Sequence, residues 1–139
     1  MPGYRLRPLP PNLAAPLKQA LRNSQDYFTG VKGYSVSHHG QFIAILGLYG
    51  ISAKGRKSAT PERLLEGFML GAAPNATPRE RTIGSIQVLK VSGVHGDPLD
   101  IYAWVAGGTL AFVDGIHRAA AQTFVVAYVK ALNASGATT

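Results

Sequence analysis

Two runs of residues joined by a pair of glycines limit the possible folds of this chain more than any other feature. Residues 99–106 alternate strictly, so that leucine, isoleucine, alanine and valine face one side of an extended segment. Gly107-Gly108 follows directly, and two glycines in this position are typical of a two-residue β-turn. The turn places Val105 opposite Leu110. The sequence therefore predicts an antiparallel hairpin near its C-terminus.

Three other segments have the composition of β-strands. Residues 31–38 and 42–49 are rich in β-branched and aromatic residues, and His39-Gly40 between them predicts a second tight turn. The segment 42–49 is apolar on both sides, which indicates a central strand that is covered on both faces. Residues 83–92 are predicted to form one more strand, which ends in a turn at 93–98.

Two helices are predicted at the two ends of this strand-rich region. The first covers residues 13–25, with Asn12 as its N-cap and Pro16 in its first turn. The last covers residues 116–132, with Asp114 as its cap. This last helix is apolar around most of its circumference, so it must be covered on more than one side. Because only 15% of the residues are charged, against about 25% in typical domains, we expect a homo-oligomer.

A polar segment with three cations lies before another predicted helix. Residues 53–59 read as a loop, and Thr60-Pro61-Glu62 then begins a helix with a hydroxyl cap, a proline at the first position and an acid in the first turn. Anions are attracted to free amides at a helix N-terminus, although a solvated basic loop is the simpler interpretation. The candidate anion-binding residues are Lys54, Arg56, Lys57, Ser58 and Thr60.

Together these elements predict an α+β domain with an antiparallel sheet of about five strands and three helices. Residues 1–11 contain four prolines and are predicted to be an extended arm. Residues 12–139 then form a single domain. A length of 139 residues with 46% hydrophobic composition is sufficient for one core.

The net charge of +7 comes from 14 Lys and Arg against 7 Asp and Glu. Such an excess favours anionic partners, including nucleic acid, but it also serves solubility. Sheets that bind nucleic acid carry aromatic and basic side chains on one exposed face. The predicted strands offer only Lys32 and Lys90 as cations, so this signal is weak.

Few residues support catalysis or metal binding. The chain has no cysteine, which excludes disulfides, thiolate catalysis and cysteine-based zinc sites. His38 ends a predicted strand and His39 follows it directly; neighbours in an extended chain point to opposite faces, so no metal site is predicted. Asp97 and Asp100 could serve acid–base chemistry beside His95, but turn formation explains them more simply. No cofactor is predicted, since neither GxxxxGK[ST] nor GxGxxG occurs.

Four runs within residues 42–132 follow one another in a familiar order: FIAILGLYG, TPERLLEGFMLGA, RTIGSIQVLKVSG and DIYAWVAGGTLAFVDG. Their order and spacing resemble small actinobacterial domains of unknown function, which are often found outside the membrane behind a single anchor. In those domains two cysteines join the two strands on which Val88 and Tyr102 stand here. The resemblance implies an α+β fold and a non-catalytic module, and it implies no active site.

The first functional interpretation is a non-enzymatic binding or assembly domain that self-associates and offers a basic surface to an anionic or protein partner. The alternatives are a nucleic-acid-binding protein and a small-ligand carrier or enzyme. An apolar pocket in the last case would lie between the sheet and the helices, near Phe68, Tyr102 and Trp104.

The chain as given contains neither a secretory signal nor a membrane span. A cytoplasmic location is therefore expected, or an extracytoplasmic one if a signal or anchor has been removed.

Overall fold

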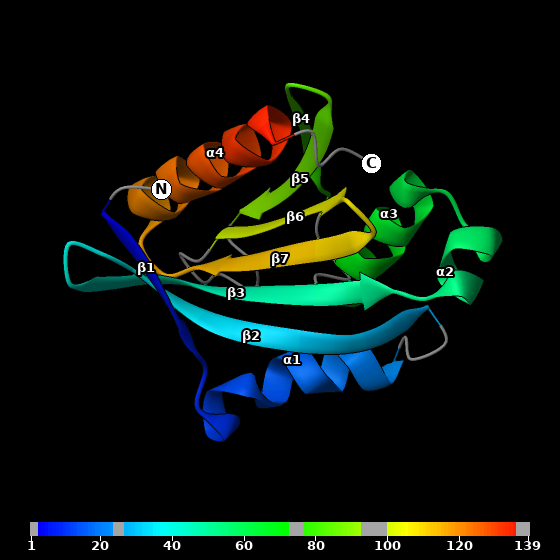
Figure 1. Cartoon of the computed structure of the whole chain (residues 1–139), viewed down its shortest axis with the longest axis horizontal. Helices are drawn as coiled ribbons and strands as arrows, with labels where there is room; N and C mark the ends of the chain where they lie inside the picture. The colour runs from blue at the N-terminus through cyan, green and yellow to red at the C-terminus, as the bar shows by residue number, and fades with distance from the viewer. Residues whose placement is uncertain (1–2, 24–26, 73–76, 93–99, 136–139) are drawn as a thin grey trace.

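The computed structural model describes residues 3–23, 27–72, 77–92 and 100–135. One antiparallel sheet with the strand order β1-β2-β3-β7-β6-β5-β4 forms its centre. The strands are β1 (Tyr4–Pro8), β2 (Phe28–His38), β3 (Gln41–Ile51), β4 (Arg79–Ile83), β5 (Ile86–Ser92), β6 (Asp100–Ala106) and β7 (Thr109–Gly115). The helices are α1 (Pro11–Asn23), α2 (Ala53–Ser58), α3 (Pro61–Ala72) and α4 (Arg118–Ala134). Helix α4 covers one face of the sheet, and α1 and α3 cover the other (Figure 1).

The predicted α+β class with an antiparallel sheet is confirmed, but the described residues hold seven strands and four helices. Both strands that the sequence did not predict lie at the edges of the sheet. Strand β1 comes from the segment 1–11, which was expected to be an arm; it pairs with β2, and Leu6 lies opposite Val36. An edge strand tolerates Pro8 because one side of its backbone is unpaired. Residues 4–8 are therefore part of the sheet.

The second edge strand, β4, begins at Arg79, four residues before the predicted strand 83–92. It pairs with β5 through a turn at Gly84-Ser85, so that Ile83 lies opposite Ile86. The predicted single strand 83–92 is thus the end of one strand and the whole of the next. Gly84 has a φ of 62°, a conformation that glycine adopts without strain. The predicted turn at 93–98 lies outside the described residues.

Both predicted hairpins are confirmed. His39 and Gly40 have φ values of 49° and 81°, and Gly107 and Gly108 have φ values of 57° and 76°. Positive φ at both central residues is the property of the turn type that suits the twist of paired strands. The predicted register of the C-terminal hairpin is also correct, with Val105 opposite Leu110.

The helix boundaries differ from the predicted ones. Helix α1 begins at Pro11, before the expected cap Asn12, because the carbonyl of Pro10 accepts its first hydrogen bonds. Pro16 therefore lies in the second turn rather than the first. The expected cap of the last helix, Asp114, is still part of β7, and α4 begins only at Arg118.

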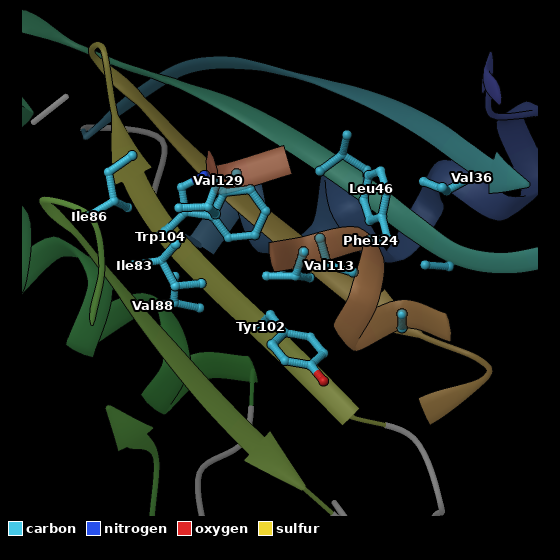
Figure 2. Close-up of a cluster of buried hydrophobic side chains, with 14 of the residues drawn as sticks. Val36, Leu46, Ile83, Ile86, Val88, Tyr102, Trp104, Val113, Phe124 and Val129 are labelled. Atoms are coloured by element: carbon cyan, nitrogen blue, oxygen red, sulfur yellow. The ribbon is translucent and has the colours of Figure 1, made fainter. Parts of the chain in front are cut away.

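The apolar side chains form one core on each face of the sheet. Helix α4 contributes to the first core, in which Trp104, Phe124 and Val129 are fully buried (Figure 2). In the second core, Leu17 of α1 lies over the paired residues Gly33 and Gly47. A methyl group at Gly33 would lie 2.9 Å from a Leu17 methyl carbon. The two glycines thus allow α1 to approach the sheet closely.

Much of the apolar surface of α4 is buried against the sheet of the same chain. Its residues Ala121, Phe124, Val125 and Val129 are buried, and Val126 is half-buried against the same core. The exposed positions carry alanine or polar side chains: Arg118, Ala119, Gln122, Thr123, Lys130, Ala131 and Ala134. Self-association stays a prediction. Among the described residues, no helix is both long and apolar enough to cross a bilayer.

Candidate functional site

A cleft of about 310 Å³ lies between α4 and the strands β4, β5 and β6. Its described lining is mostly apolar inside and carries three cations and one acid. The lining residues are Arg79, Glu80, Arg81, Ile83, Val88, Lys90, Tyr102, Gln122, Val125 and Val126. Ligand pockets are commonly concave, apolar and furnished with a few converging polar groups. This cleft has that character.

Tyr102 is the most unusual lining residue. Its side chain projects from β6 toward the α4 side, as do Trp104 and, from β5, Val88 (Figure 2). The residue is only 3% exposed, and its buried hydroxyl has no hydrogen-bond partner among the described residues. Burial raises the pKa of Tyr102 to about 12, and the negative charge of Asp100 adds to the rise. The hydroxyl therefore stays protonated at neutral pH and can donate a hydrogen bond.

Two cations hold a buried carboxylate beside Tyr102. Asp100 is 2% exposed, and its two oxygens lie 3.3 Å from Nε of Arg118 and 3.7 Å from Nζ of Lys90. Burial of a carboxylate is costly unless cations or hydrogen bonds compensate it. Asp100 thus keeps two positive charges close to the cleft.

Lys90 is held by several long contacts rather than by one short one. Its Nζ lies 3.7 Å from Asp100 and 3.4 Å from Oε1 of Gln122. It also lies 5.5 Å from the ring centroid of Tyr102. Strong hydrogen bonds between charged groups are about 2.7–2.9 Å long. The ammonium group can therefore move toward a better partner without losing a strong bond.

The sheet register adds a second cation to this group. Arg79 lies directly opposite Lys90, and Lys90 lies directly opposite Tyr102. Residues that are directly opposite in neighbouring strands point to the same face, and like charges in such a pair are destabilising. The row of Arg79, Lys90 and Tyr102 brings two cations and a hydroxyl together without a matching anion in the row.

The cleft continues along α4 as an open groove of about 540 Å³. The two depressions share Arg81, Gln122 and Val126. The groove ends at Lys130, on the exposed side of the helix. A ligand seated at Tyr102 could thus extend outward along α4.

Asn133 fixes the helix against the hairpin that forms one wall. Its Nδ2 donates to the carbonyl oxygen of Ile83 at 2.8 Å and to that of Val129 at 3.1 Å. Its Oδ1 accepts hydrogen bonds from the backbone N–H and the hydroxyl of Ser85, at 3.2 and 3.1 Å. This side chain therefore sets the distance between α4 and the turn from β4 to β5.

The three residues predicted to line a pocket do not lie together. Tyr102 lines the cleft. Trp104 faces the same side but is only 1% exposed and packs against Tyr128, with the ring centroids 5.6 Å apart. Phe68 of α3 lies on the opposite face of the sheet, where its ring contacts Tyr49 at 5.0 Å. The alternation of the strands could not show that α3 covers the other face.

The predicted anion-binding segment is a short helix, not a loop. The hydroxyl of Ser52 accepts a hydrogen bond from the N–H of Gly55 and caps α2. The hydroxyl of Thr60 accepts one from the N–H of Arg63 at 3.3 Å, so it serves as the cap of α3. The side chains of Arg56, Lys57 and Ser58 are exposed, as is that of Lys54. Anion binding by this segment stays a prediction.

The histidine pair is arranged differently from the prediction. His39 lies in the turn with positive φ, and this brings its ring centroid within 4.1 Å of that of His38. A true strand would have sent the two rings to opposite faces. His117 lies near Gln41, with 3.2 Å between their Nε2 atoms. Across the described part of the chain, no three histidine or acidic side chains gather as metal ligands.

Lys90, Asp100 and Gln122 were not predicted as neighbours of Tyr102. Asp100 was expected to serve a turn, but it is the first residue of β6 and points to the same side as Tyr102. The alternation of residues 100–106 already indicated that Asp100 and Tyr102 point to the same face. The predicted partners of Asp100, Asp97 and His95, lie outside the described residues.

Comparisons with models of known protein families, with curated proteins and with solved structures found no match to this chain. The resemblance to small actinobacterial domains therefore stays a prediction. The two positions that carry cysteine in that pattern, Val88 and Tyr102, lie on neighbouring strands. Both line the cleft.

Proposed function

We propose that this protein is a non-enzymatic binding domain whose cleft under α4 takes a small anionic ligand with an apolar body. The observation that carries the proposal is the buried hydroxyl of Tyr102, which has no partner within the described structure. Leaving such a group unsatisfied costs about 1–3 kcal/mol. A ligand oxygen that accepts its hydrogen bond would remove this cost.

The charges around the cleft favour an anion over a neutral ligand. Arg79 and Lys90 lie directly opposite one another, and an anionic group between them would relieve their repulsion. Movement of Lys90 toward this group would also uncover the Tyr102 ring, over which its ammonium lies. Ligand binding would thus use the weakly held cation and the unsatisfied hydroxyl together.

The apolar walls of the cleft favour a ligand whose uncharged part is apolar. Ile83, Val88 and Val125 are buried apolar residues of the lining, and they would contact an aliphatic or aromatic body. The cleft volume of about 310 Å³ lies at the lower end of the range of about 300–1,000 Å³ for ligand pockets. A short fatty acid or a small aromatic carboxylate has the right combination of size and charge.

Calorimetric titration with octanoate tests this proposal, with octanol as a probe of the same chain length without the charge. We expect octanoate to bind and octanol to bind at least about tenfold more weakly, since a charged hydrogen bond contributes about 1.5–3 kcal/mol. Lys90→Gln should weaken octanoate binding by a similar factor. Lys32→Gln removes an exposed cation from β2, away from the cleft, and should have no effect.

Two results would contradict the proposal. One is the absence of octanoate binding at millimolar concentration, and the other is equal affinity for octanoate and octanol. Native mass spectrometry of the purified protein would show a ligand retained from the host, and it would also test the predicted self-association by the number of subunits.

Direct binding of nucleic acid has less support. Of the two cations on the strands that were predicted from the sequence, Lys90 lines the cleft under α4 and only Lys32 is exposed. The exposed arginines of the two edge strands lie at opposite edges of the sheet. A steep decrease of affinity for duplex DNA with rising salt concentration would favour this alternative.

A further inference from the structure

We propose a second binding site, for a phosphoryl group, at the end of the sheet where β1 meets the turn between β2 and β3. A depression of about 460 Å³ lies there. Its described lining consists of Gly3, Tyr4, Arg5, Arg7, Ser37, His39 and Gly40. None of these residues is acidic, and two are arginines.

The two arginines point to the same side of β1. Arg5 and Arg7 are two residues apart on a strand, so their Cα atoms are about 6.5–7 Å apart and their side chains project from one face. Ser37 lies opposite Arg5, and Ser35 lies opposite Arg7. The face that carries the two guanidinium groups therefore also carries two hydroxyls from the neighbouring strand.

Neither guanidinium group is neutralised within the described structure. The ion pairs found there join Lys90 and Arg118 to Asp100, and neither involves Arg5 or Arg7. Like charges on neighbouring positions repel one another. An anion between the two side chains would remove this repulsion.

Stacked rings hold the start of β1 against the turn between β2 and β3. Tyr4 stacks on His38 with the ring centroids 4.5 Å apart, and His38 lies 4.1 Å from His39. The backbone N–H of His39 donates to the carbonyl oxygen of Gly3 at 3.2 Å. Tyr4 lies directly opposite His38 in the sheet register, so the two rings lie on the face that does not carry the arginines. These contacts fix the backbone at the start of β1 against the turn.

Guanidinium groups suit phosphoryl oxygens because their planar N–H donors form two parallel hydrogen bonds to one phosphate. Two such groups beside the Ser37 hydroxyl match a phosphate monoester or a diphosphate better than a carboxylate, which has only two oxygens. This site lies at the β1 edge of the sheet, and the cleft lies at the β4 edge. The two proposals are therefore independent of one another.

The test is a titration with inorganic pyrophosphate at constant ionic strength, followed by calorimetry and ³¹P NMR. We expect Arg5→Gln and Arg7→Gln each to weaken binding by about tenfold or more, as the loss of a charged hydrogen bond does. Arg63→Gln is the matched control, because Arg63 is also an exposed arginine but lies on α3. It should change the affinity by less than about twofold, since it alters only the net charge.

Two outcomes would overturn the proposal. If the wild-type protein does not bind pyrophosphate at millimolar concentration, the depression is not a phosphoryl site. If Arg63→Gln weakens binding as much as Arg5→Gln, the effect is one of net charge. In either case, increased light scattering by the Arg5→Gln and Arg7→Gln variants would show that the arginines only protect the exposed edge of β1 from aggregation. Octanoate binding to the cleft would be unaffected by these results.

Discussion

Replacement of Tyr102 by phenylalanine should stabilise the protein in the absence of ligand, although Tyr102 is part of the hydrophobic core. The ring would stay in place, and only a hydroxyl that has no partner among the described residues would be lost. Burial of an unsatisfied hydroxyl costs about 1–3 kcal/mol. We therefore expect Tyr102→Phe to raise the free energy of unfolding by about 1–2 kcal/mol.

The same substitution at Tyr49 provides a matched control with the opposite sign. Tyr49 is also fully buried, but its hydroxyl donates a hydrogen bond to the carbonyl oxygen of Leu17 at 3.0 Å. Tyr49→Phe removes this bond between β3 and α1. Since a hydrogen bond contributes about 0.5–1.5 kcal/mol net, we expect this variant to lose about 1 kcal/mol.

Thermal unfolding followed by circular dichroism can separate the two variants. The unfolding entropy of a chain of this length corresponds to about 3–4 °C in Tm for each kcal/mol. Tyr102→Phe should therefore melt above the wild type and Tyr49→Phe below it. Equal destabilisation by both substitutions would refute the argument, because it would show that the Tyr102 hydroxyl has a partner. Octanoate should also bind Tyr102→Phe more weakly, so that the stabilising substitution impairs the proposed function.

Three further predictions follow from the packing and the charges. Gly33→Ala should destabilise the protein by about 1–2 kcal/mol in urea unfolding, because the new methyl group would contact Leu17 too closely; Gly30→Ala, with open space at that position, should be neutral or slightly stabilising. Asn133→Ala should cost about 2 kcal/mol and speed amide hydrogen exchange in the turn from β4 to β5, because it removes the hydrogen bonds that hold this turn to α4. Burial raises the pKa of Tyr102 from 10.0 to about 12. Between pH 10 and pH 12 the folded state therefore keeps a proton that the unfolded state releases. Stability should fall by about 2–3 kcal/mol as pH rises through this range, and Tyr102→Phe should make this part of the decrease disappear.

The parts of the fold that the sequence predicted correctly are those whose information is local. Gly107-Gly108 and His39-Gly40 require a particular backbone conformation, and alternating apolar residues on both sides define the paired strands. The edge strands β1 and β4 lack this signal, because most of their residues are exposed. They become strands through hydrogen bonds to a neighbour, and a sequence pattern does not show which neighbour is available.

The candidate cleft was only partly predictable for a related reason. Tyr102 could be identified as a residue of a buried strand. Lys90, Arg79 and Gln122 reach it from β5, β4 and α4, and their convergence depends on the strand order and on the face that α4 covers. Neither property follows from periodicity, which is the same for either face of a sheet.

The arrangement around Asp100 explains why the cleft should select for charge rather than size alone. A buried ion pair contributes little to stability after its desolvation, so Asp100 is better understood by what it holds in place. It keeps Arg118 at 3.3 Å and Lys90 at the longer distance of 3.7 Å. An anionic ligand can attract Lys90 while Asp100 retains Arg118, and no buried charge is then left without a partner. A neutral ligand offers Lys90 no negative charge in place of Asp100, so the ammonium group stays over the Tyr102 ring. In the proposed function, selectivity for an anion would therefore arise from the weaker hold of Asp100 on Lys90 than on Arg118.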